Sequence, residues 1–199
     1  MLELKNVAYS YQSYSEDILS NVNYQFENGT FYSIIGQSGT GKSTLLSLLA
    51  GLDNPKKGQV LFDGEDIQTK GSSYHRKHHV SLVFQNYNLI DYLTPLENVR
   101  LVNKQAGKEI LLELGLDETQ IKRKCPATIR RAATAGGHCA CARFRSTCHL
   151  ADEPTGNLDE QTAGDIIAIL KKLAKERQKC VIVVTHSKEV AEAPMWSWN

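Results

Sequence analysis

The chain lacks a long hydrophobic run, a strong excess of either charge and an apolar segment near its start. No stretch approaches the roughly 18 apolar residues that a membrane-spanning helix needs. The 23 Lys and Arg residues nearly balance the 22 Asp and Glu residues, which gives no reason to expect nucleic acid as a partner. The first residues alternate between apolar and polar side chains, unlike a secretory signal peptide. We therefore expect a cytoplasmic protein whose membrane role, if it has one, comes through a partner.

Cysteine is scarce, with 5 residues among 199, and it is unevenly distributed. In such a chain we expect free thiols and not a disulfide framework. Four of the five crowd one stretch, and these are Cys125, Cys139, Cys141 and Cys148. Their C-x-C spacing does not match the paired C-x-x-C of zinc sites, so no zinc site is expected there.

The most informative feature that is present is the string G-Q-S-G-T-G-K-S-T at residues 36–44. It satisfies every fixed position of the phosphate-binding loop G-x-x-x-x-G-K-[ST]. In such a loop the glycines let backbone N–H groups turn toward a phosphate, and the following helix presents its positive N-terminus. Lys42 then reaches the β- and γ-phosphates, and the Ser43 hydroxyl ligates Mg²⁺. The string predicts that this chain, or its ancestor, binds a nucleoside triphosphate.

The pattern around this loop predicts an α/β fold of the P-loop NTPase type. Strands are expected at residues 2–9, 18–26, 31–35, 58–62, 80–84 and 180–185, and helices at 44–50, 95–99, 108–116 and 159–175. Residues 2–9 and 18–26 read as antiparallel, whereas strands that alternate with helices imply a mostly parallel, helix-covered sheet. The residues after Gln85 are mostly polar and have a pattern typical of helices, which indicates an inserted helical subdomain. We expect one domain, with a core at 1–85 and 150–193 and the insert at 86–149.

A second string, L-A-D-E-P-T-G-N-L-D at residues 150–159, supplies residue types that the loop lacks. An acidic residue at the end of a strand can hold Mg²⁺, and a second carboxylate can orient or deprotonate the attacking water. Asp152 and Glu153 have these types at adjacent positions. A lone Asp-Glu pair is usually a solvated loop, but the whole string after a phosphate-binding loop favours a catalytic role.

These two strings make the chain resemble the nucleotide-binding subunits of ATP-binding cassette (ABC) transporters. The similarity is to the branch that serves lipoprotein release, macrolide efflux and bacteriocin export, and it covers residues 1 to about 124 and 150 to about 193. The resemblance implies an ABC-type ATPase core with an antiparallel β subdomain and an inserted helical subdomain. It also implies ATP and Mg²⁺ as ligands, a nucleotide-dependent homodimer or heterodimer, and a transmembrane permease that keeps the subunit at the inner face of the membrane.

The resemblance assigns roles to single residues. Tyr11 would stack on adenine, Gln85 would contact Mg²⁺ and the attacking water, and Asp152 would hold the metal. Glu153 would be the catalytic base, and His186 would sense the γ-phosphate. The residues assigned to ATP are Tyr11, Gly36, Gln37, Ser38, Gly39, Thr40, Gly41, Lys42, Ser43 and Thr44, and those assigned to Mg²⁺ are Ser43, Gln85 and Asp152.

Several of these residues would carry little weight alone. Taken alone, Tyr11 would more often be a packing or surface residue. Gln85 would be an ordinary polar residue at the end of a strand, and His186 a histidine in a solvated loop. A basic run precedes residue 80, namely His75, Arg76, Lys77, His78 and His79. We expect this run to be a solvated face and not a metal or phosphate site.

The chain departs from the family where the signature L-S-G-G-Q is expected, because residues 128–142 read T-I-R-R-A-A-T-A-G-G-H-C-A-C-A. Codons that encode this segment give L-S-G-G-Q-Q-Q-R-V-A-I-A-R-A when they are read one base later. Codons for residues 194–199 give D-V-V-L-E when they are read two bases later. We hypothesise that residues 125–149 and 194–199 are out-of-frame translations of an ordinary transporter gene.

This departure has physical consequences. In the family, two subunits meet head to tail, each ATP lies between one phosphate-binding loop and the other subunit's signature, and residues 157–159 would line the contact. The residues at 130–132 cannot reproduce the signature surface. Polar residues at 146–149 also replace most of the apolar run expected before Asp152, at a cost of about 1–3 kcal/mol for each unpaired group. The tail would stop short of the family's last strands and expose Trp196 and Trp198.

We expect an ATP-binding subunit that couples ATP binding and hydrolysis to export, by in-line attack of water on the γ-phosphate. One alternative is a degenerate subunit or pseudogene product that binds ATP but hydrolyses it poorly, because the signature is absent. The other is a cassette ATPase without a transporter, although such proteins usually carry two cassettes or large inserted arms, and this chain has neither.

Overall fold

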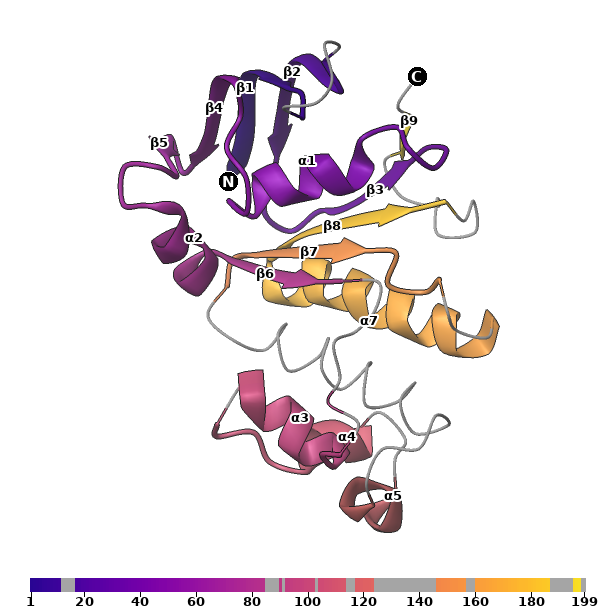
Figure 1. The fold of residues 1–199 in the computed structure, drawn as a ribbon. Helices are drawn as coiled ribbons and strands as arrows, with labels where there is room; N and C mark the ends of the chain where they lie inside the picture. Colours follow the sequence, from indigo (N-terminus) through magenta and orange to yellow (C-terminus); the bar gives the residue numbers. More distant parts are fainter. Residues whose placement is uncertain are drawn as a thin grey trace.

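Two β-sheets of different type frame the protein, and the helix that follows the phosphate-binding loop, α1 (Lys42–Leu49), lies between them (Figure 1). The computed structural model describes residues 1–11, 17–84, 90, 92–102, 104–113, 117–123, 146–156, 160–186 and 195–197. One sheet is antiparallel and the other is parallel. This arrangement confirms the expected P-loop architecture with an antiparallel β subdomain.

The antiparallel sheet joins the first two strands to a later hairpin. Its strands are β1 (Leu2–Tyr9), β2 (Leu19–Phe26), β4 (Lys57–Phe62) and β5 (Glu65–Asp66), in the order β2-β1-β4-β5. Leu2 and Leu4 are buried while Lys5 is exposed, because β1 turns one face to the core and the other to solvent. Leu2 pairs with Phe26 on one side and Phe62 on the other, as the antiparallel prediction requires.

The parallel sheet carries the loop and the acidic string. Its strands are β3 (Phe31–Ile35), β6 (Val80–Val83), β7 (Cys148–Asp152), β8 (Cys180–Thr185) and β9 (Met195–Ser197), in the order β6-β7-β8-β3-β9. Every residue of β8 is buried, because α1 packs on one face of the sheet and α7 (Glu160–Arg177) on the other. The prediction of a mostly parallel sheet covered by helices is confirmed.

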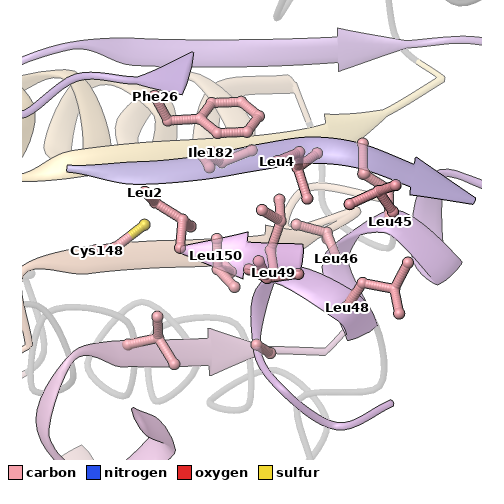
Figure 2. Packing of buried hydrophobic residues seen from close by; sticks show 14 of the residues in the cluster. Leu2, Leu4, Phe26, Leu45, Leu46, Leu48, Leu49, Cys148, Leu150 and Ile182 are labelled. Carbon is pink, nitrogen blue, oxygen red and sulfur yellow. The ribbon is translucent and has the colours of Figure 1, made fainter. Parts of the chain in front are cut away.

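Side chains from both sheets and from α1 form the larger hydrophobic core (Figure 2). Alternate residues of β8 divide between the two faces: Ile182 joins this core, whereas Val181 and Val183 join a second cluster under α7. Leu48 and Leu49 of α1 have no exposed surface. The helix that begins at the phosphate-binding loop is therefore fixed by packing over its whole length.

In the described residues between β6 and β7, where the sequence predicts an insert, three short helices are present: α3 (Pro95–Val102), α4 (Glu109–Glu113) and α5 (Glu118–Lys122). They gather away from the antiparallel sheet (Figure 1), and α3 contacts α5. Asp117 begins α5 with a capping box, since its carboxylate accepts from the Gln120 N–H and the Gln120 side chain accepts from the Asp117 N–H. The bounds of the insert stay a prediction. Among the helices of the described ranges, none is long and apolar enough to cross a membrane.

The strand that ends at Asp152 is β7, and it begins at Cys148, inside the run of polar residues at 146–149. Cys148 and His149 are both buried, and the Ser81 hydroxyl hydrogen-bonds Nδ1 of His149. Cys148 pairs with Val80 on one side and Cys180 on the other. Backbone pairing to both neighbours places these residues in the sheet, so part of the polar run that replaces the expected apolar residues lies in a central strand.

The tail adds a strand where the sequence predicted none. Met195–Ser197 forms β9 and runs parallel to β3, with Ser33 opposite Met195 and Ile35 opposite Ser197. The side chains of Trp196 and Trp198, which we expected to be exposed, lie outside the described residues. The backbone pairing shows that the end of the chain contributes to the parallel sheet.

The prediction of a solvated basic run is wrong for His75. Residues 72–78 form α2 (Ser72–His78), and His75 is only 1% exposed. Its Nε2 lies 3.0 Å from the carbonyl oxygen of Leu49, at the end of α1, and its Nδ1 lies 3.2 Å from Nδ1 of His79. The guanidinium of Arg76 likewise donates to the carbonyl of Gly51. These side chains satisfy carbonyl groups that the end of α1 leaves open.

Candidate functional site

The phosphate-binding loop joins β3 to α1, and its glycines take a conformation that other residues rarely adopt. Gly39 and Gly41 both have a φ of +87°. Gly41 immediately precedes α1, and a Cβ atom there would lie 2.6 Å from Cγ2 of Ile18. A side chain at this position would be strained by its φ angle and by that contact. The loop therefore needs glycine where it turns into the helix.

Lys42 is drawn into the loop and is only 8% exposed. Its Nζ donates to the carbonyl oxygens of Gly36 at 2.8 Å and Gln37 at 2.7 Å. The hydroxyl of Thr40 also donates to the Gln37 carbonyl, at 2.9 Å, and closes the loop. The ammonium thus lies beside the N-terminus of α1, where the helix dipole already favours an anion. The loop is built to receive phosphate.

Ser43 and Asp152 meet across the gap between the first turn of α1 and the end of β7. The Ser43 hydroxyl lies close enough to the Asp152 carboxylate to act on it as a hydrogen-bond donor. Burial raises the pKa of Asp152, and the charge of Glu153 raises it further, whereas the Ser43 bond and Lys42 lower it. A hydroxyl and a carboxylate at one point are hard oxygen donors of the kind that Mg²⁺ prefers. These residues fit the metal site that the sequence predicted.

Glu153 and His186 form the second pair of the site. Oε2 of Glu153 lies 2.9 Å from Nδ1 of His186, which directly follows β8. Glu153 has a φ of +47°, a conformation that costs a non-glycine residue roughly 1–2 kcal/mol. Its N–H donates to the carbonyl of Val184 at 2.8 Å, which holds the turn in place. A strained backbone held by its neighbours is typical of functional positions.

Tyr11 lies just beyond the end of β1 and reaches the first turn of α1. Its hydroxyl is 3.0 Å from Oγ1 of Thr44, and its side chain is 44% exposed. The ring therefore lies beside the phosphate-binding residues and keeps surface open to a ligand. The adenine contact that the resemblance implies for Tyr11 stays a prediction.

For the other predicted site residues, the structure gives only the element in which they lie or does not describe them. Gly36, Gln37, Ser38 and Thr40 all lie in the loop between β3 and α1. Gln85 lies outside the described residues, as do the expected dimer contact at 157–159 and the segment 128–142 that stands in place of the signature. The described half of the site is the half that one subunit supplies around its own phosphate-binding loop.

Sequence reasoning missed the surroundings of Tyr11. The ring of Tyr9 is perpendicular to that of Tyr11, with their centroids 5.3 Å apart. The Tyr9 hydroxyl donates to the Asp53 carboxylate, and this bond, together with burial, raises the pKa of Tyr9 to about 12. Asp53 lies beyond the end of α1. No spacing in the sequence indicated that Tyr9 and Asp53 would be partners.

Comparison with known proteins identifies the family. The sequence model of the ABC transporter family matches residues 19–156, a span that contains the phosphate-binding loop, Asp152 and Glu153. The chain belongs to the ABC transporter family. It is an ATP-binding subunit of that family, whose members bind ATP, generally with Mg²⁺. This finding confirms the resemblance on which the site was predicted.

Two relatives and one solved structure show how far the similarity extends. An uncharacterized ABC transporter ATP-binding protein of Bacillus subtilis, YclH, is 38% identical, with 96% of this chain and 89% of YclH aligned. The lipoprotein-releasing system ATP-binding protein LolD of Wigglesworthia glossinidia brevipalpis is 35% identical, with 96% of this chain and 90% of LolD aligned. The dimeric structure of the cassette MJ0796 of Methanocaldococcus jannaschii has a TM-score of 0.83 at 33% identity, and covers 99% of this chain and 94% of its own. None of these similarities favours a degenerate subunit over the main function.

Proposed function

We propose that this ABC subunit binds Mg·ATP with the residues gathered at its phosphate-binding loop and hydrolyses it to drive export through a separate membrane permease. One observation carries the proposal. Two pairs, Ser43 with Asp152 and Glu153 with His186, converge at the carboxyl ends of β7 and β8. Ligands of open α/β sheets bind at the carboxyl ends of their strands.

The residues of the loop would hold the triphosphate. Lys42 would contact the β- and γ-phosphates, while the backbone N–H groups from Gly39 to Thr44 surround them. The ring of Tyr11 would stack on adenine, since it lies beside Thr44 and keeps exposed surface. Ser43 and Asp152 would hold Mg²⁺, and the resemblance to the family assigns Gln85 to the same ion. Mg²⁺ held by these residues would supply positive charge to neutralise the negative charge that develops on the phosphates.

Hydrolysis would depend on Glu153. Its carboxylate would accept the proton of the attacking water, and general-base catalysis of this kind contributes about 10²- to 10⁴-fold. His186 holds Oε2 of Glu153 at 2.9 Å and would orient the carboxylate toward the γ-phosphate. The side chain of Glu153 is only 17% exposed, whereas that of His186 is 60% exposed. The base is therefore largely enclosed, whereas the histidine keeps most of its side chain exposed.

The partners follow from the relatives. LolD is named as part of a lipoprotein-releasing system, and MJ0796 forms a dimeric cassette. By this similarity we propose that two subunits of this chain, or this chain and a related one, assemble on a transmembrane permease. The subunit would then lie at the cytoplasmic face of the membrane.

A second function is favoured by one observation, the segment 128–142. That segment does not carry L-S-G-G-Q, so the surface that would close over the partner's ATP is missing from the chain as written. In this form the protein would bind ATP but turn it over slowly. If residues 125–149 and 194–199 are out-of-frame translations, the gene itself encodes an intact subunit, and resequencing the DNA shows whether another frame yields the signature.

One experiment separates the two functions. The ATPase rate of the purified chain is compared with that of a restored chain, in which L-S-G-G-Q-Q-Q-R-V-A-I-A-R-A replaces the 14 residues 128–141. If the subunit is an active transport ATPase, the restored chain should hydrolyse ATP, and Glu153→Gln should lower that rate by about 10²- to 10⁴-fold. The matched control is Glu160→Gln, an exposed carboxylate in the first turn of α7. Turnover that Glu153→Gln leaves unchanged would contradict the proposed base, and Glu153-dependent turnover in the chain as written would contradict the degenerate function.

A further inference from the structure

Tyr9 links the ring of Tyr11 to a part of the chain that lies outside the nucleotide site. On one side, its ring is perpendicular to that of Tyr11 at 5.3 Å between centroids. On the other side, its hydroxyl donates to the carboxylate of Asp53, in the turn that follows α1. Tyr9 is 6% exposed and Tyr11 is 44% exposed. A buried, anchored ring therefore supports an exposed one.

The surroundings of Tyr9 are tied down by further bonds. The Lys56 N–H donates to the carbonyl of Ala8 at 2.9 Å, and its Nζ donates to the Ser10 hydroxyl at 2.7 Å. The carbonyl of Tyr9 accepts from the Ile18 N–H at 2.8 Å. The end of β1 is thus fastened on both sides of Tyr9 to the segment that runs from α1 to β4. This fixed frame gives Tyr9 a set position relative to α1.

We propose that Tyr9, anchored by Asp53, is a positioning residue that holds the Tyr11 ring in place for the adenine base. The proposal rests on the adenine contact proposed above for Tyr11. It adds a residue that touches no part of the nucleotide and acts through Tyr11 alone. Asp53 completes the support, since it fixes the hydroxyl end of the Tyr9 ring.

The physical reason is preorganisation. An exposed tyrosine loses side-chain freedom when a base stacks on it, and that loss weakens binding. A perpendicular ring contact favours one orientation of Tyr11 before the nucleotide arrives. The second contact of Tyr11, between its hydroxyl and Oγ1 of Thr44, fixes the far end of the same ring. Together they place the ring beside the residue that follows Ser43 in the phosphate-binding loop.

A purely structural role for Tyr9 makes a different prediction. If Tyr9 only fills the core, its replacement lowers the stability of the fold and affects every ligand of the loop alike. If Tyr9 positions Tyr11, its replacement weakens binding of the base and spares binding of the phosphates. Inorganic tripolyphosphate with Mg²⁺ has the phosphates without the base, so it distinguishes these two roles.

The test measures equilibrium binding of Mg·ATP and Mg·tripolyphosphate to the purified chain and its variants. Tyr11→Ala should weaken ATP binding by about 5- to 100-fold, the range given by stacking of a base on an aromatic ring, and leave tripolyphosphate unchanged. Tyr9→Leu should weaken ATP binding by about 3- to 10-fold, the range of an aromatic pair contact, again without an effect on tripolyphosphate. In the double variant, Tyr9→Leu should cause no further loss, because its effect passes through Tyr11.

Three further variants make the result decisive. Tyr9→Phe and Asp53→Ala each remove the hydroxyl bond but keep the ring, so both should fold and show a smaller loss that is again confined to ATP. Tyr24→Leu removes an aromatic ring of β2 whose centroid lies 4.7 Å from that of Phe26. This control should lower the stability of the fold without changing the ratio of the affinities for ATP and tripolyphosphate. Equal losses for ATP and tripolyphosphate in Tyr9→Leu, or an additive double variant, would overturn the positioning role and leave Tyr11 intact. An unchanged ATP affinity in Tyr11→Ala would instead overturn the adenine contact itself.

Discussion

The hydroxyl of Ser43 lies within reach of the carboxylate of Asp152 as a hydrogen-bond donor, and this contact connects the first turn of α1 with the end of β7. It is the point at which the two informative strings of the sequence meet in space. Both side chains are oxygen donors, and Lys42 lies close enough to lower the pKa of the carboxyl group. The contact therefore marks where a metal ion and the phosphates would share ligands.

The raised pKa of Asp152 predicts opposite effects of one substitution on stability and on binding. The folded chain binds the Asp152 proton more tightly than the unfolded chain does. The contribution of protonated Asp152 to the free energy of unfolding is therefore complete below the unfolded pKa and is lost as the pH rises through the folded pKa. At pH 7.5 the ionised carboxylate destabilises the ligand-free protein. Asp152→Asn should therefore raise the Tm of the ligand-free chain while it weakens Mg·ATP binding by at least about 10-fold.

Thermal melts with and without Mg·ATP check this prediction. Asp165→Asn, at an exposed position of α7, is the matched control and should change the free energy of unfolding by less than about 0.5 kcal/mol. Ser43→Ala should also weaken Mg·ATP binding. If Asp152→Asn kept the full Mg²⁺-dependent rise in Tm, the assignment of Asp152 to the metal would be wrong.

The contact between Glu153 and His186 predicts a positioning effect on turnover. His186→Ala removes the imidazole that lies 2.9 Å from the proposed base. In the restored chain we expect kcat to fall by roughly 10- to 100-fold, as when a group that orients a reacting side chain is removed, with little change in KM. His78→Ala, in α2 and away from the site, is the control. With Glu153→Gln already present, His186→Ala should add little, and a full additional loss would show that His186 acts independently of Glu153.

The residues of the site were more predictable than their supports. The phosphate-binding loop and the string at 150–159 depend on fixed chemistry at fixed spacing, so the sequence alone brought Ser43, Asp152 and Glu153 together. The alternation in β1 and β2 predicted the antiparallel strands, because a half-buried strand has a period of two residues. The contact between Tyr9 and Asp53 could not be predicted in this way, since no local pattern records which distant residue a buried hydroxyl meets.

Composition was a poorer guide at β7 and at α2. It predicted that polar residues at 146–149 would cost a central strand stability and that residues 75–79 would form a solvated face. In the structure, pairing with β6 and β8 places Cys148 and His149 in the sheet, and His75 turns inward to the open carbonyl of Leu49. In both elements the need of backbone N–H and C=O groups for hydrogen-bond partners accounts for where these side chains lie. The hydropathy of single residues does not include that need.

The burial of His75 predicts that acid destabilises the fold. Burial lowers the pKa of His75, and the nearby His79 and Arg76 lower it further, although the bond to Leu49 opposes this shift. A histidine with a lowered pKa is kept neutral by folding, so its contribution is complete above the unfolded pKa of about 6.5 and is lost as the pH falls through the folded pKa. Because Nε2 donates to the Leu49 carbonyl, Nδ1 of neutral His75 accepts from His79, and protonation would set two N–H groups against each other.

Denaturant unfolding between pH 7.5 and pH 5 measures this effect. His75→Leu should lower the free energy of unfolding by about 1–3 kcal/mol at pH 7.5, because it leaves a buried carbonyl without its donor. It should also flatten the loss of stability toward pH 5. His78→Leu, on the more exposed side of α2, should preserve the pH dependence of the original chain. The same acid sensitivity in His75→Leu would show that another group is responsible.

The pairing of Cys148 with Cys180 predicts how these thiols react. The two residues are opposite each other in β7 and β8, and each is 1% exposed. Burial raises the pKa of the Cys148 thiol well above its usual range, and the contact with Cys180 raises it further, so the reactive thiolate is suppressed.

Both cysteines are free in the structure, and alkylation requires the sheet to open. If opening needs global unfolding of at least about 5 kcal/mol, labelling should be slower than in the denatured chain by about 10³-fold or more. Iodoacetamide labelling followed by peptide mass mapping at these two positions measures the ratio, and Cys148→Val, which keeps an apolar side chain at this position, should leave Cys180 equally protected. Rapid labelling of Cys148 in the native chain would show that β7 does not begin where the structure places it.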